Sequence, residues 1–185
     1  MMRQTLAGPT GTVGLAEPCP VDVLAGQWWV VHTRSRCEKA LAGYLDRHGI
    51  GYFLPLAVKR RRYGRHLVNV QIPLFPCYLF LCGGDEERYT ALTTHRVAGI
   101  IPVLDQEQLK NELRQIHRIM LSEQPVDLYP ALRQGRRCRV LSGPLAGLEG
   151  VVLRRRDTCR IYVGVEVLGQ SAELEIDPSL LEPIE

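Results

Sequence analysis

Side chains able to do chemistry are present in this sequence, but their spacing assembles no catalytic motif. The histidines stand at His32, His48, His66, His95 and His117. None of these positions has the spacing of metal ligands, and neither an activated nucleophile nor a phosphate-binding glycine loop accompanies them. The sequence therefore predicts a protein that is not an enzyme and that carries no cofactor.

The cysteines are equally scattered along the chain. They stand at Cys19, Cys37, Cys77, Cys82, Cys138 and Cys159. Because no pair has the two-residue spacing of a zinc knuckle or a redox motif, no metal site is expected. Free thiols packed as small apolar residues are the simpler interpretation, and they fit a reducing cytoplasm.

A run of basic residues could bind phosphates. It comprises Lys59, Arg60, Arg61, Arg62 and Arg65, and no acidic residue occurs between Arg47 and Gly84. Arginines on a loop without balancing carboxylates attract a nucleic-acid backbone. We expect these residues, joined by Arg34, to bind nucleic acid; a solvated hairpin is the alternative.

The overall composition limits the class of protein. The chain has 185 residues, 45% hydrophobic residues and a formal charge of +3. This is a globular composition, and its charge is too mild to indicate nucleic-acid binding by itself. No apolar run reaches the ~18 residues that a membrane helix needs, and the N-terminus has no signal-peptide core. We expect a protein with no membrane contact.

The first half of the chain has the residue patterns of strands and helices, and the basic run falls in a predicted hairpin. Aromatic and β-branched runs predict strands at residues 27–33, 50–55, 76–82 and 99–104, and a hairpin at 57–72 that turns at Gly64. Helices are expected from a capping box of Ser35 and Glu38 to Gly49, at 85–92, and from Asp105 onward with a buried stripe of Leu109, Leu113, Ile116 and Met120. This order predicts an α+β domain with helices against one antiparallel sheet.

The rest of the chain divides into a tail, a linker and a second domain. Residues 1–26 are rich in glycine and proline and are expected to form a flexible tail. The first domain should span 27–121, followed by a proline-containing linker at 122–130 and a C-terminal domain at 131–185. Alternating apolar residues and glycine turns there favour a small all-β barrel.

Two segments carry a family resemblance. The glycine spacing of GRRCRVLSGPLAGLEGVV, residues 135–152, is similar to the KOW motif, whose barrel is SH3-like. The first domain resembles the NusG N-terminal domain, in WWVVHTRSRCEKAL at 28–41, FLP at 53–55 and PLFPCYLF at 73–80. The last segment resembles the specialised antitermination branch typified by RfaH, since housekeeping members commonly have glycine at the position of Cys77.

The resemblance implies a monomeric transcription elongation and antitermination factor that binds the clamp of RNA polymerase. Carried over position by position, the polymerase contacts fall on His32, Phe53, Phe75, Tyr78 and Phe80. Aromatic side chains suit this role because they concentrate binding energy. Core packing is the alternative for Phe53 and Phe80, whereas Phe75 and Tyr78, on either side of Pro76 and Cys77, are expected to be exposed.

The resemblance also implies further partners. It places the basic run near upstream or non-template DNA, and it assigns Leu148 and Leu168 to contact with a small-subunit ribosomal protein or the termination factor Rho. A structural RNA-binding protein of the ribosome is the alternative function, which the modest net charge disfavours. A C-terminal domain that refolds as helices is disfavoured by its glycines and by the alternation at 161–167.

Overall fold

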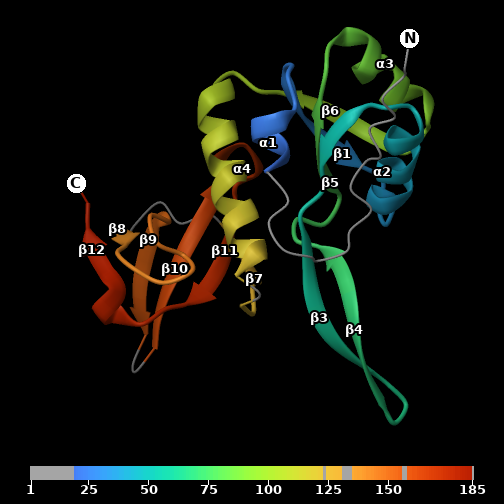
Figure 1. Ribbon diagram of the computed structural model, residues 1–185. Coiled ribbons are helices and arrows are strands. Elements are labelled where there is room, and N and C mark those ends of the chain that lie inside the picture. The colour runs from blue at the N-terminus through green and yellow to red at the C-terminus, as the bar shows by residue number, and fades with distance from the viewer. Residues whose placement is uncertain (1–18, 123, 131–134, 156–157, 185) are drawn as a thin grey trace, which may run out of the picture. The chain divides into compact units, whose positions relative to one another are not determined.

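An antiparallel four-stranded sheet organises the first part of the chain, in the order β2-β5-β1-β6 (Figure 1). Its strands are β1 (Trp28–Thr33), β2 (Gly51–Phe53), β5 (Tyr78–Cys82) and β6 (Val97–Pro102). The computed structural model describes residues 19–122, 124–130, 135–155 and 158–184. It divides into a first unit, residues 1–54 and 76–106, and a second unit, residues 55–75 and 107–185.

Alternation along the two central strands gives this sheet two different faces. Val31 on β1 stands opposite Leu79 on β5, and Val30 stands opposite Phe80. Because opposed residues of antiparallel strands share a face, Val31 and Leu79 lie on one side and Val30 and Phe80 on the other.

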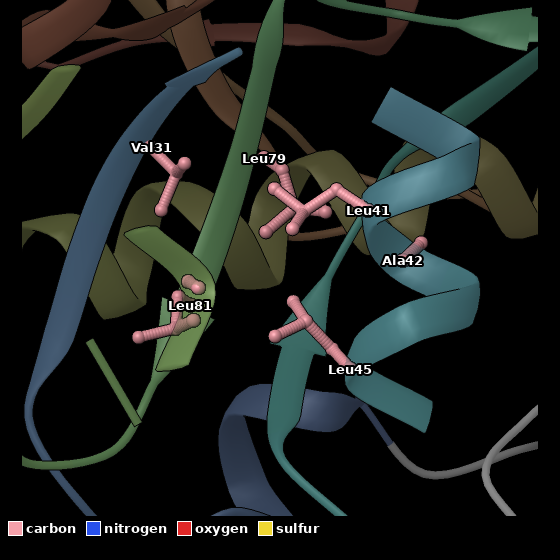
Figure 2. Close-up of a cluster of buried hydrophobic side chains, with 7 residues drawn as sticks. Val31, Leu41, Ala42, Leu45, Leu79 and Leu81 are labelled. Carbon is pink, nitrogen blue, oxygen red and sulfur yellow. The ribbon is translucent and has the colours of Figure 1, made fainter. Parts of the chain in front are cut away.

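The face of Val31 packs against α2 (Glu38–Arg47), and the core there also includes Ala91 of α3 (Asp85–Thr93). Figure 2 shows Leu41 and Leu45 of α2 pointing toward Leu79 and Leu81 of the sheet. All four leucines are fully buried. Burial of each such side chain contributes about 1.5–3 kcal/mol, so this cluster holds the helix on the sheet.

The start of α2 differs from the predicted capping box. The residue before the helix is Cys37, no side chain caps it, and Glu38 is the first helical residue. The Glu38 side chain is buried and accepts a hydrogen bond from the backbone N–H of Cys77. The capping box of Ser35 and Glu38 is therefore wrong, because a long-range backbone donor takes the carboxylate. The predicted stop is confirmed: Gly49 adopts φ +67° and its N–H bonds the carbonyl of Asp46.

Part of the predicted tail is ordered. Residues 1–18 lie outside the described residues, but α1 (Pro20–Val23) follows them, and its Val21 is only 4% exposed. Leu24 lies close against Gly51 of β2, where a side chain would meet Leu24 Cδ2 at 2.9 Å. The expectation of a flexible tail is wrong for residues 20–24, because apolar contacts with the sheet offset the cost of ordering them.

The hairpin of the second unit is formed by β3 (Leu56–Tyr63) and β4 (His66–Pro73), drawn as a long two-stranded ribbon in Figure 1. The predicted turn at Gly64 is confirmed, and Gly64 adopts φ +60° there. Eight cross-strand pairs run from Leu56–Pro73 at the base to Tyr63–His66 at the tip. The ribbon pairs with no other strand of the described residues, so both of its edges are free.

The second unit also contains α4 (Gln106–Leu121), which begins one residue before the unit does, and a six-stranded antiparallel sheet in the order β12-β8-β9-β10-β11-β7. Its strands are β7 (Asp127–Pro130), β8 (Arg136–Val140), β9 (Glu149–Arg155), β10 (Thr158–Val165), β11 (Gln170–Glu175) and β12 (Leu181–Pro183), with short 3-10 turns η1 (Glu166–Leu168) and η2 (Pro178–Leu180). The mixed α and β class is confirmed, and closure of this sheet into an SH3-like barrel stays a prediction.

Two details of the second unit differ from expectation. The predicted linker at 122–130 includes β7, which pairs with β11, so its last four residues belong to the sheet. On α4, Leu109, Leu113 and Ile116 are buried as expected, but Ile119 is buried in place of the half-buried Met120. Residues 131–134, the predicted start of the C-terminal domain, lie outside the described residues.

Candidate functional site

Four of the five predicted polymerase contacts share one face of the first sheet. His32 on β1 is opposite Tyr78 on β5, and Phe53 on β2 is opposite Phe80 on β5. The rings of His32 and Tyr78 are stacked, with centroids 5.0 Å apart and an angle of 28°. Phe53 and Phe80 are also stacked, with centroids 6.4 Å apart. The topology therefore assembles an aromatic row from residues distant in sequence.

Only half of this aromatic row is accessible. His32 is exposed and Tyr78 is half-buried, whereas Phe53 and Phe80 are 4% and 0% exposed. The two phenylalanines are thus core residues, the alternative that the sequence left open. The His32–Tyr78 pair is therefore the accessible part of the row, and the two phenylalanines are buried on the same face of the sheet.

Phe75 does not belong to the accessible pair. It is 1% exposed, so the expectation that it would be exposed beside Pro76 is wrong. The hairpin ladder continues past Pro73, because the N–H of Leu74 donates to the carbonyl of Pro55 at 2.8 Å. This bond fixes residues 74–75 at the base of the hairpin, and both of their side chains are buried.

The segment that leads into Tyr78 is held by two hydrogen bonds on the peptide groups of Cys77. The N–H of Cys77 donates to Glu38 Oε1 at 2.7 Å, and the N–H of Thr33 donates to the Cys77 carbonyl at 2.8 Å. Cys77 adopts φ +65°, in the left-handed region that favours glycine. This role of Glu38 could not be predicted from the sequence, because a local helix-capping pattern accounts for the same residue.

The hairpin presents its basic residues to solvent. Arg60, Arg61, Arg62 and Arg65 are all exposed. Lys59 is partly covered and forms an ion pair with Asp127 at 3.0 Å. Four of the five predicted basic residues on the hairpin are thus exposed arginines. Arg34 is also exposed, and it belongs to the first unit.

The two predicted docking leucines of the C-terminal sheet have different environments. Leu148 is fully buried and Leu168 is half-buried in η1. Backbone N–H groups near both leucines donate hydrogen bonds to side chains of α4. The Glu149 N–H donates to Gln115 Oε1 at 2.8 Å, and the Glu166 N–H donates to Glu112 Oε1 at 3.2 Å. The Leu148 side chain is thus withdrawn from solvent in this structure, and its contact with a docking partner stays a prediction.

No group of three or more histidine, cysteine, aspartate or glutamate side chains is arranged to hold a metal ion among the residues that the structure describes. In the same part of the chain, no helix is both long and apolar enough to cross a bilayer.

Comparison with known proteins gives one family and one fold. Residues 26–120 match the family model described as transcription termination factor NusG. A solved structure titled "Domain interaction in Thermotoga maritima NusG" is similar over 86% of this chain and 97% of that chain, with a TM-score of 0.50 and 21% sequence identity. No curated protein matches the sequence.

Proposed function

The chain belongs to the NusG family, whose members are transcription factors that interact with RNA polymerase and are not enzymes, and we propose that it is an elongation and antitermination factor that binds the polymerase clamp. It would act by binding alone. A ligand that prefers one of two states shifts their balance by its differential affinity. Preference for the closed clamp would disfavour the opening that accompanies pausing, and so promote processivity.

The observation that carries this proposal is the accessible His32–Tyr78 stack on an otherwise buried aromatic face. An aromatic side chain that is half-buried in its own fold gives a partner a large contact area at a low cost in side-chain entropy. Tyr78 also follows the doubly hydrogen-bonded Cys77, so its backbone is already positioned before binding. Such preorganisation lowers the cost of association.

The test is capture of RNA polymerase by the full-length chain and its Tyr78→Ala variant. We expect the variant to lose about 2 kcal/mol of binding free energy, which is about 30-fold in affinity, because truncation of a central aromatic contact commonly costs that much. Tyr44→Ala is the matched control, since Tyr44 stacks on His48 at 4.0 Å in the same unit but on α2.

Equal polymerase affinity of the Tyr78 and Tyr44 variants would show that the pair is not the contact. Co-purification with ribosomes in place of polymerase would favour the alternative function, a structural RNA-binding protein of the ribosome.

We also propose that the hairpin binds upstream or non-template DNA, and its exposed arginines support this proposal. The C-terminal sheet would dock a small-subunit ribosomal protein or Rho through Leu168, which remains partly accessible.

A further inference from the structure

The hairpin has two chemically different faces, which the pairing of its strands defines. Opposed residues share a face, and successive residues alternate. One face, here called the open face, carries the pairs Val58–Gln71, Arg60–Asn69 and Arg62–Leu67. The other, here called the tethered face, carries Ala57–Ile72, Lys59–Val70 and Arg61–Val68.

The tethered face is partly covered near its base. Lys59 reaches Asp127 of β7 at 3.0 Å, and Ala57, Val70 and Ile72 are half-buried. In the same half of the hairpin, the open face is more accessible: Val58 is 55% exposed, and Arg60 and Asn69 are both exposed. The side chains of Arg60 and Asn69 therefore stand next to each other in solvent.

The open face has the composition of a base-reading surface. Arginine binds the guanine edge with two hydrogen bonds, asparagine and glutamine do the same with adenine, and apolar groups contact the thymine methyl. Arg60, Arg62 and Asn69, which are all exposed, supply the first two kinds of group, and Leu67, which is 69% exposed, supplies the third. Arginine and asparagine also bind phosphates, but the exposed apolar side chain of Leu67 beside them can contact a base and not a phosphate.

The shape of the ribbon selects the groove. A two-stranded ribbon fits the major groove of B-form DNA, which is about 12 Å wide. The major groove of an RNA duplex is too deep and narrow for side chains to read. Successive pairs on one face are about 7 Å apart, which is about two base-pair steps. The three pairs of the open face would thus cover on the order of five base pairs.

We propose that the open face of the hairpin reads base edges in the major groove of duplex DNA, with Arg60 and Asn69 as the specificity-determining pair. This inference rests on the proposed function, because it specifies how the hairpin binds DNA. Positive charge alone would bind any DNA sequence equally, whereas the open face would prefer particular base pairs. Arg61, on the tethered face, then contributes charge but no base recognition.

The experiment is selection from a random duplex DNA library with the full-length protein and three variants: Arg60→Ala, Asn69→Ala and Arg61→Ala. All three residues are exposed on the hairpin, so the variants should keep the fold, which circular dichroism checks. Arg61→Ala is the matched control for Arg60→Ala, because it removes the same charge one position away on the opposite face.

We expect the wild type to enrich a motif of on the order of five base pairs, with at least ~10-fold discrimination at the position that Arg60 reads. Arg60→Ala should abolish the preference there, and Asn69→Ala should abolish it at a neighbouring position. Arg61→Ala should weaken binding to every sequence alike and lower the slope of log affinity against log salt by about one unit.

Three results would overturn the proposal: binding without an enriched motif, equal loss of preference in the Arg60 and Arg61 variants, or binding to single strands alone. Polymerase capture distinguishes failure of this inference from failure of the proposed function. An Arg60 variant that still captures polymerase but shows unchanged base preference refutes the inference only. A Tyr78 variant with undiminished polymerase capture refutes the proposed clamp contact only.

Discussion

Replacing Glu38 with alanine should destabilise the first unit and loosen the segment that presents Tyr78. The Glu38 side chain is 6% exposed and accepts the Cys77 N–H at 2.7 Å. Hydrogen bonds to charged groups contribute about 1.5–3 kcal/mol, and removal of the acceptor leaves the donor unpaired. We therefore expect Glu38→Ala to lower the free energy of unfolding by about 2–3 kcal/mol.

Two companion variants separate the hydrogen bond from other effects of the substitution. Glu38→Gln keeps an acceptor oxygen in place and should lose no more than about 1 kcal/mol. Cys77→Gly relieves the left-handed backbone at φ +65°, which costs a residue with a side chain about 1–2 kcal/mol. It should stabilise the unit by less than that amount, since glycine also gains entropy in the unfolded chain.

Guanidinium denaturation followed by tryptophan fluorescence measures these changes selectively. The chain has two tryptophans, Trp28 and Trp29, and both lie on β1 of the first unit. The signal therefore reports the unfolding of the sheet that Glu38 supports. Amide hydrogen exchange at Cys77 gives a second readout, which should become faster in Glu38→Ala. A loss below about 0.5 kcal/mol, or equal losses in the alanine and glutamine variants, would refute the reasoning.

Three further changes have defined outcomes. Gly150→Ala should destabilise the second unit by about 1–3 kcal/mol, because a Cβ there would lie 2.6 Å from the Tyr162 carbonyl oxygen. Gly164→Ala is the control, since its Cβ would meet Ser171 Oγ at an ordinary contact distance of 3.4 Å. Thermal unfolding followed by circular dichroism compares the two variants. Burial, reinforced by the hydrogen bond to Asp46, raises the pKa of Tyr52 above its usual value. The stability that the neutral phenol contributes is thus present below about pH 10 and lost as the pH rises further, so Tyr52→Phe should flatten the alkaline fall in unfolding free energy measured by tryptophan fluorescence. Leu168→Ser should weaken capture of the ribosomal protein or Rho with little change in melting temperature. Leu148→Ser should lower the melting temperature by several degrees, because Leu148 is fully buried. Equal melting temperatures of the two variants would contradict this difference in burial.

Local pattern was sufficient for the elements themselves. The run from Trp28 to Thr33, the repeat of Leu41 and Leu45, and the turn at Gly64 each report a periodicity or a backbone preference that neighbouring residues decide. The exposed arginines of the hairpin were also predictable, because charged side chains avoid burial without partners. Alternating apolar residues and glycine turns in residues 131–185 likewise predicted strands there, which β8, β9, β10 and β11 confirm.

Tertiary structure alone decided which candidate residues are accessible and what they bind. Phe75, Phe80 and Leu148 have the apolar side chains of either a core or an interface, and only packing from distant segments withdraws them from solvent. Glu38 fits a local capping pattern, yet its partner lies 39 residues away. Lys59 belongs to a run of basic residues, yet Asp127 pairs with it from 68 residues away. Hydrogen bonds and ion pairs depend on distance in space, and a sequence records only distance along the chain.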